Sequence, residues 1–168
     1  MTVIIDTNVI LVANGKHDDA SFDCVAACAR RLESAMTNDR IALDEGFEIL
    51  REYQNKIQPK KGNGPGDAFV KWALRNKANP KHCDLVRLQT HPIRGYESFP
   101  DDERLVNFDT SDKKFVAVAA AHDEQPPIAQ AVDSKWVDWE KALADYGITV
   151  EFVCPADIHR FHTKKFGK

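Results

Sequence analysis

Short apolar runs alternate along the chain with longer segments in which apolar residues recur every three or four positions. The run 2–5 has the pattern of a buried strand, and the segment 22–35 has the helical period. The apolar pattern resumes after Asp6 and is broken at Gly15. By the same criteria the expected strands are 2–5, 40–43, 83–89, 126–133 and 148–155, and the expected helices are 22–35, 45–57, 67–76, 110–122 and 136–147.

This alternation of strand and helix predicts an α/β fold, because parallel strands joined by helices form a sheet that is covered on both faces. We therefore expect a three-layer αβα, Rossmann-like arrangement with a central, mostly parallel sheet. The length of 168 residues fits a single domain spanning 1–168. A segment at about 56–95, with a loop rich in Gly and Lys, is interpreted as a basic insertion.

Composition and charge restrict the expected partners and location. The net charge is -3 and the pI is about 6.1, so binding to nucleic acid would require a local basic patch. No apolar run reaches the ~18 residues of a membrane span, and no basic leader precedes the apolar start, which predicts a cytoplasmic protein with no membrane partner. Cys24 and Cys28 share a helical face, and we expect them to be reduced thiols in the core.

Several carboxylates are predicted to meet at one edge of the sheet. Asp6 and Asp133 follow predicted strands, and ligands of open parallel sheets bind at the carboxyl ends of the strands. Asp112 lies in the first turn of a predicted helix, and Glu48 and Glu52 share one helical face. Such carboxylates would repel one another unless divalent cations bound them, and oxygen ligands of this kind suit Mg²⁺ or Mn²⁺. Two such ions can activate water and stabilise the leaving oxygen in phosphodiester cleavage.

The acids also have structural interpretations. Asp112 could favour a helix N-terminus through the helix dipole, and Glu52 could pair with Lys56 one turn further on. Asp6 is harder to explain in this way, because an ionised side chain among strand residues costs several kcal/mol unless it is paired or metal-bound.

The order of these acids resembles that of PIN-domain nucleases. In that family the first strand ends in Asp-Thr-Asn, as in "VIIDTN" here, and a Glu in the helix after the second strand corresponds to Glu52 in "ILREY". The third acid opens a helix, like Asp112 in "DTSDKKFVAVAAAH", and the fourth follows the next strand, like Asp133 in "AVDSKW". The resemblance implies a PIN-like fold and a metal-dependent endoribonuclease that cleaves single-stranded RNA by two-metal-ion hydrolysis. Many members of the family are the toxin of a toxin–antitoxin pair.

Two points of the site are left open by the sequence. PIN domains commonly carry another Asp two residues after the fourth acid, where this chain has Lys135. Glu48 is an alternative to Glu52, because both lie on one helical face. Thr7 and Asn8 begin the turn after the first acid and could hydrogen-bond its carboxylate or a substrate phosphate. The predicted catalytic and metal-binding residues are Asp6, Glu52, Asp112 and Asp133, and the supporting residues are Thr7, Asn8, Glu48, Asp109 and Lys135.

A local excess of basic residues lies between positions 55 and 82. We expect this segment to lie beside the acidic pocket and to contact RNA phosphates. Phe69 and Trp72 in the same stretch are predicted to be core residues rather than a surface that stacks on bases. The predicted RNA-binding residues are Lys60, Lys61, Lys71 and Arg75.

Two other functions fit parts of the pattern. A haloacid-dehalogenase-like phosphatase also begins with an Asp at a strand end, but it needs a second Asp two residues later, where this chain has Asn8. A PIN-like domain that binds RNA or a protein without cleavage would tolerate Lys135. An antitoxin protein and a second copy of the chain, in a homodimer, are further partners that the resemblance allows.

Overall fold

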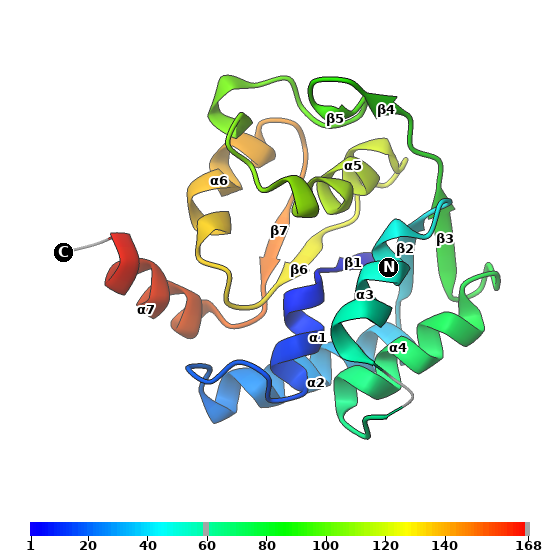
Figure 1. Ribbon diagram of the computed structural model, residues 1–168, viewed down its shortest axis with the longest axis vertical. Helices are drawn as coiled ribbons and strands as arrows, with labels where there is room; N and C mark the ends of the chain where they lie inside the picture. The colour runs from blue at the N-terminus through cyan, green and yellow to red at the C-terminus, as the bar shows by residue number, and fades with distance from the viewer. Residues whose placement is uncertain (59–60, 167–168) are drawn as a thin grey trace.

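A five-stranded parallel sheet forms the centre of the protein (Figure 1). The computed structural model describes residues 1–58 and 61–166, so the predicted RNA contact Lys60 lies outside the described residues. The strands of this sheet are β1 Thr2–Ile5, β2 Arg40–Asp44, β3 Cys83–Val86, β6 Ile128–Gln130 and β7 Val150–Phe152, and a separate antiparallel pair is formed by β4 Thr90–His91 and β5 Gly95–Tyr96. The order across the main sheet is β3-β2-β1-β6-β7, with every pairing parallel.

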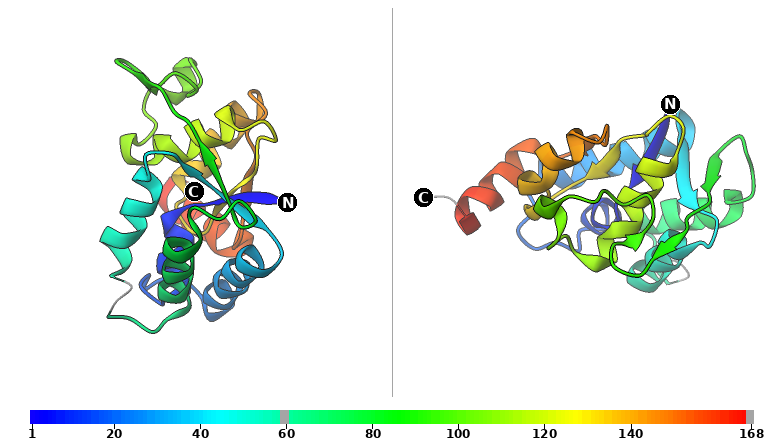
Figure 2. Two further views of the ribbon diagram at one scale, coloured as in Figure 1. Left: turned by 90° about the vertical axis from the view of Figure 1, so that its right-hand side faces the viewer. Right: turned by 90° about the horizontal axis from the view of Figure 1, so that it is seen from above.

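Helices cover both faces of this sheet and complete three layers. They are α1 Thr7–Ala13, α2 Phe22–Thr37, α3 Glu48–Ile57, α4 Pro65–Asn76, α5 Lys113–Ala121, α6 Lys135–Ala144 and α7 Pro155–Phe166, with 3₁₀ turns η1 Glu103–Leu105 and η2 Thr110–Asp112. In the left view of Figure 2, α1, α2 and α4 lie below the sheet, and α5 and α6 lie above it. The predicted α/β class with three layers and a parallel sheet is confirmed.

β1 is the middle strand of the sheet, and its last three residues are apolar. Val3, Ile4 and Ile5 are completely buried. Val3 lies opposite Ile41 of β2, and Ile4 lies opposite Ile128 of β6. A continuous apolar run of this kind is typical of a parallel strand with helices on both sides. The pairing brings the carboxyl ends of β1, β2 and β6 to the same edge of the sheet.

Some predicted boundaries differ from the structure. β6 ends at Gln130, three residues before Asp133, because the buried Gln130 Oε1 accepts hydrogen bonds from the backbone N of Ala131 (2.9 Å) and of Asp133 (3.4 Å). Asp133 therefore lies in a loop and not at the strand end. The apolar residues after Asp6 form the helix α1 and do not continue the strand.

The Gly-rich segment before α4 allows close packing of two helices. A Cβ on Gly66 would lie only 2.4 Å from the carbonyl oxygen of Ile10, so glycine is required for α4 to start this close to α1. Asn14 Oδ1 accepts a hydrogen bond from Gly66 N (2.7 Å), and Asp67 Oδ2 accepts one from Gly64 N (2.9 Å). This part of the segment predicted as an insertion is thus tied to the end of α1.

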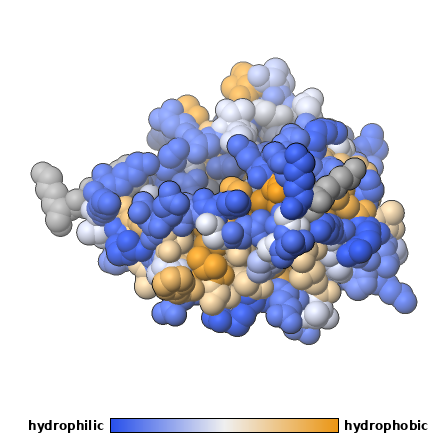
Figure 3. Space-filling model, turned by 60° about the horizontal axis from the view of Figure 1, so that its bottom comes forward, coloured by the Kyte–Doolittle hydropathy of each residue, from blue (hydrophilic) through white to orange (hydrophobic). Residues whose placement is uncertain are grey.

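The outer surface is mainly polar. The face shown in Figure 3 is largely hydrophilic, with apolar side chains in small patches. Phe22 and Ile93 are the most exposed large apolar residues in the described part of the chain, and they belong to different elements. Among the described helices, none combines the length and the apolar character needed to cross a membrane.

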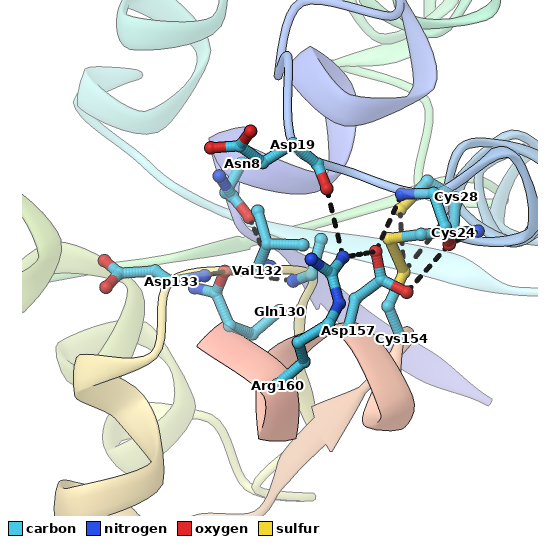
Figure 4. Close-up of a disulfide and its surroundings, with 12 residues drawn as sticks. Asn8, Asp19, Cys24, Cys28, Gln130, Val132, Asp133, Cys154, Asp157 and Arg160 are labelled. Atoms are coloured by element: carbon cyan, nitrogen blue, oxygen red, sulfur yellow. Dashed lines mark hydrogen bonds and ion pairs between the residues drawn. A yellow bond between two sulfur atoms is a disulfide. The ribbon is translucent and has the colours of Figure 1, made fainter. Parts of the chain in front are cut away.

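A disulfide joins α2 to the start of α7 (Figure 4). Cys24 bonds Cys154 across 130 residues of sequence, and the free Cys28 Sγ lies 3.7 Å from Cys154 Sγ. Beside the disulfide, Asp157 accepts hydrogen bonds from Ser21 N and Ser21 Oγ, both at 2.8 Å. The prediction of a reduced thiol is wrong for Cys24. Disulfides persist mainly in oxidising compartments, so this bond does not favour the predicted cytoplasmic location.

Candidate metal centre

Asp6 stands where β1 ends and α1 begins, at the carboxyl edge of the sheet. It is the N-cap of α1, and its Oδ1 accepts a hydrogen bond from Asn8 N at 2.8 Å. The residue is only 5% exposed, and its other oxygen, Oδ2, is buried without a hydrogen-bond partner among the described residues. Because a buried carboxylate oxygen without a donor is costly, a bound cation would relieve this arrangement.

Three further aspartates lie close together at the same edge. Asp109 and Asp112 lie at the two ends of the 3₁₀ turn before α5, and Asp133 lies in the loop between β6 and α6. One carboxylate oxygen of each lies within 4.8 Å of the others. This spacing allows a single oxygen-liganded ion to contact all three. Asp109, which the sequence suggested only as a supporting residue, is thus a full member of the group.

Glu52 reaches this edge from the middle of α3, but protein donors already occupy both of its oxygens. Lys114 Nζ lies 2.8 Å from Glu52 Oε1, and Thr7 Oγ1 donates a hydrogen bond to Glu52 Oε2. Glu48 is exposed one turn earlier, where it accepts a hydrogen bond from Tyr96 OH at 2.7 Å. The structure therefore brings Glu52 to the aspartates and directs Glu48 elsewhere.

Burial and mutual repulsion raise the pKa values of Asp6, Asp112 and Asp133. Desolvation is the main cause for Asp6, whose pKa lies well above its ordinary value, and the charge of Asp112 adds to it. The pKa of Asp112 is raised to about 7 by burial first, and then by the charges of Asp133 and Glu52. Burial also raises the pKa of Asp133, although Lys135 opposes the effect. Carboxylates that are crowded in this way are typical of a functional site.

Asp112 does not cap its helix through a hydrogen bond, so its structural contribution is limited to the helix dipole. Asp112 is the N-cap of α5, but its side chain makes no capping hydrogen bond. The alternative pairing of Glu52 with Lys56 is replaced by the contact with Lys114. Both acids thus direct their charge toward the cluster.

Lys135 directs its ammonium group at the edge of the cluster. Its Nζ lies 3.0 Å from Asp109 Oδ2, and this contact raises the pKa of the lysine. Asp138, one turn further along α6, is largely exposed and pairs with His162 at 2.9 Å. Asp138 therefore does not replace the acid that PIN domains commonly have at position 135.

Asn8 connects the two halves of the site. Its backbone N donates to Asp6, and its Oδ1 accepts a hydrogen bond from Val132 N at 2.7 Å (Figure 4). The loop that carries Asp133 is thereby anchored to the start of α1. Thr7, the other predicted supporting residue, orients Glu52 instead of Asp6.

The chemistry of these ligands fits a hard divalent cation. Asp6, Asp109, Asp112 and Asp133 would offer carboxylate oxygens, which suit Mg²⁺ or Mn²⁺ better than metals that prefer sulfur or imidazole. Together with Glu52 they make five acids facing two ammonium groups, so three negative charges stay uncompensated when all the acids are ionised. The unpartnered Asp6 Oδ2 is the observation that most directly supports a bound cation.

Of the predicted RNA-binding residues that the structure describes, Lys61 and Lys71 lie near the end of α1 that is far from Asp6. α4 starts against Asn14, the C-cap of α1, and a seven-residue helix is about 10 Å long. Lys71 donates to a backbone carbonyl of the preceding loop at 3.2 Å, while Lys61 and Arg75 are exposed. The start of α4, with Lys61 and Lys71 beside it, is therefore about one helix length from Asp6 and away from the acidic cluster.

A cavity of about 520 Å³ opens beside this segment, between the ends of α1 and α3, and three lysines line it. They are Lys16, Lys56 and Lys61. Phe69 is buried, as predicted, and Trp72 stacks on it with the ring centroids 6.0 Å apart. The aromatic residues thus belong to the packing of α4, and the lysines form the exposed charge.

Two buried charged residues near the site were not predicted from the sequence. Asp44 is buried, and its carboxylate accepts hydrogen bonds from Glu48 N (2.8 Å) and Ile49 N (3.0 Å), which fixes the start of α3. Lys114 is a buried charged residue in the first turn of α5. A lysine followed directly by the apolar run 115–121 is the signal that could have identified it.

Comparison of the chain with family models, with curated proteins and with solved structures finds no match. The functional assignment therefore depends on the geometry of the carboxylates and on the resemblance of the motifs.

Proposed function

We propose that the protein is a PIN-like, Mg²⁺- or Mn²⁺-dependent endoribonuclease that hydrolyses phosphodiester bonds of single-stranded RNA. The observation that carries this proposal is the buried, unpartnered Asp6 Oδ2 beside a group of aspartates whose oxygens lie within 4.8 Å of one another. The order of these acids along the chain matches the PIN motif, which connects the geometry to phosphodiester cleavage.

The residues of this chain have distinct tasks in the proposed reaction. When bound, the divalent cation would supply a Lewis acid for the phosphate and an activated water molecule. Asp6, Asp109, Asp112 and Asp133 would hold the cation, and Asp112, whose pKa is raised to about 7, would bind it in its deprotonated form. Asn8 keeps the Asp133 loop at the correct distance from Asp6 through its hydrogen bond to the loop backbone.

Cleavage of a labelled single-stranded RNA tests this proposal. The wild type should cleave it with Mn²⁺ and not with EDTA, and Asp6→Asn should lose at least a hundredfold in rate. Asparagine is as good an N-cap as aspartate, so this variant should keep α1 folded. Asp123→Asn, at an exposed position just beyond the other end of α5, is the matched control and should retain full activity. Metal-independent cleavage, or full activity of Asp6→Asn, would refute the proposal.

Other outcomes would support the alternative functions. Hydrolysis of a small phosphomonoester would favour a phosphatase. That class needs an acid at position 8, where this chain has Asn8, whose Oδ1 accepts a hydrogen bond from Val132 N. RNA binding without cleavage would favour a non-catalytic PIN-like domain. An antitoxin partner and a homodimer stay predictions from the resemblance. Measuring the molecular mass of the purified protein in solution, alone and with neighbouring gene products, would test both predictions.

A further inference from the structure

Lys114 is a buried cation inside the carboxylate cluster. The residue is 9% exposed and lies in the first turn of α5. Its Nζ lies 2.8 Å from Glu52 Oε1, donates a hydrogen bond to the carbonyl oxygen of Ser111, and lies 5.2 Å from the centre of the Phe115 ring. All of these contacts hold the ammonium group on the side of the cluster where Glu52 enters.

This position is unfavourable for a lysine without its acidic neighbours. A cation in the first turn of a helix opposes the helix dipole, and burial removes the hydration of the ammonium group. The contact with Glu52 and the nearby charge of Asp112 compensate for both costs. Lys114 is therefore held in place by the carboxylates and is fixed in its orientation.

The same contacts divide the cluster into two parts. On one side, both oxygens of Glu52 accept hydrogen bonds from Lys114 and Thr7. On the other side, Asp6 Oδ2 has no partner among the described residues. Asp112 lies beside Asp109 and Asp133, with one carboxylate oxygen of each close enough for all three to bind the same ion. Positive charge is thus already present at Glu52 and lacking at Asp6.

We propose that Lys114 takes the place of the second divalent cation, so that the resting site binds one ion, on the side of Asp6. Lys114 acts as a positioning residue, because it keeps Glu52 engaged and withholds it from a second ion. This inference rests on the proposed function, since it concerns the cation of that same site. It replaces the two-ion occupancy that the resemblance to PIN domains implies.

Calorimetric titration with Mn²⁺ alone tests the inference, with Lys113→Met as the matched control. Lys113 precedes Lys114 and places its Nζ 5.0 Å from the centre of the Phe99 ring, on a different group of side chains. The wild type and Lys113→Met should bind one Mn²⁺. Lys114→Met should bind a second Mn²⁺ at least tenfold more tightly than the wild type does. Two equal sites in the wild type, or an unchanged isotherm for Lys114→Met, would overturn the inference.

Two further variants keep the test decisive if Lys114→Met does not fold. The double variant Lys114→Met/Glu52→Gln removes both partners and should return to one Mn²⁺. Glu52→Gln alone should bind one Mn²⁺ with an affinity within threefold of the wild type, because Glu52 does not contact the resident ion. A tenfold loss of affinity in Glu52→Gln would contradict the division of the site.

RNA cleavage measured on the same samples separates this inference from the proposed function. If the wild type binds one Mn²⁺ and Lys114→Met binds two, but neither cleaves RNA, the proposed function fails and the role of Lys114 stands. If RNA is cleaved and the wild type binds two equal ions, the role of Lys114 fails and the proposed function stands.

Discussion

Replacing Asp112 by Asn should stabilise the protein when no metal is bound. Burial, followed by the charges of Asp133 and Glu52, raises the pKa of Asp112 from 3.8 to about 7. The folded state therefore favours the protonated acid, and the resulting stability is fully present below pH 3.8 and lost as the pH rises through about 7. At pH 8 Asp112 is ionised in the folded protein, and its buried negative charge lowers the free energy of unfolding. The neutral amide of Asn avoids this loss.

The size of the effect follows from the pKa. A rise from 3.8 to about 7 corresponds to about 4 kcal/mol in the free energy of unfolding. The gain is reduced because an amide also loses hydration when buried, and because an ionised acid favours the N-terminus of α5, each by about 1 kcal/mol. We expect Asp112→Asn to raise the free energy of unfolding by about 2 kcal/mol at pH 8 in EDTA, and to have almost no effect at pH 4.

Urea titrations monitored by tryptophan fluorescence would measure this difference, with Glu140→Gln at an exposed position of α6 as the control. In saturating Mn²⁺ the wild type should become more stable than Asp112→Asn. Mn²⁺ at a hundred times its Kd stabilises the wild type by about 2.7 kcal/mol, and the variant should gain less because it lacks one of the carboxylates expected to bind the ion. The electrostatic reasoning is refuted if Asp112→Asn is no more stable than the wild type at pH 8, or if the difference is the same at pH 4.

Three further predictions concern the neighbours of the cluster and the disulfide. In saturating Mn²⁺, Glu52→Gln should lower the free energy of unfolding by about 2 kcal/mol, because it leaves the buried Lys114 without its carboxylate. The control Glu48→Gln should change the free energy of unfolding by less than about 1 kcal/mol. Equal losses for the two variants in urea titrations would contradict this prediction. Asn8→Ala should weaken Mn²⁺ binding about tenfold in calorimetry, because the Asp133 loop loses its anchor, as loss of a ligand-orienting contact does elsewhere. Reduction with dithiothreitol should lower the stability of the wild type by about 3 kcal/mol. It should leave Cys24→Ala/Cys28→Ala unchanged, because this variant removes both thiols beside Cys154, and an equal response of both proteins would exclude the disulfide.

The fold could be predicted because its strands are short, continuous apolar runs between segments of helical period. The run at residues 2–5 predicted β1, whose residues are all buried, since a strand covered on both faces is apolar along most of its length. The end of β6 could not be predicted, because it depends on the side chain of Gln130 bonding to its own backbone neighbours. Local bonds of this kind leave no mark in the pattern of apolar residues.

The site could be predicted for the residues that the topology alone brings together. Asp6 and Asp133 follow the strands β1 and β6, Asp112 precedes the helix α5, and the order of the three acids along the chain carried the prediction. The contact between Lys114 and Glu52 joins residues 62 apart in sequence, and the disulfide joins residues 130 apart. Pairs that are so distant depend on the packing of side chains in three dimensions, which one sequence does not reveal.

The disulfide described above closes most of the chain into a covalent ring. Four of the five strands of the main sheet lie inside this ring, and only β1 lies outside it, on the free N-terminal tail. That tail lies between β2 and β6 and carries Asp6, so the ring by itself has neither the middle strand of the sheet nor the Asp6 carboxylate. A cut in the loop between α1 and α2 would thus divide the protein into a ring and a short peptide, and a synthetic peptide of the N-terminal residues would be the piece that completes the carboxylate cluster again.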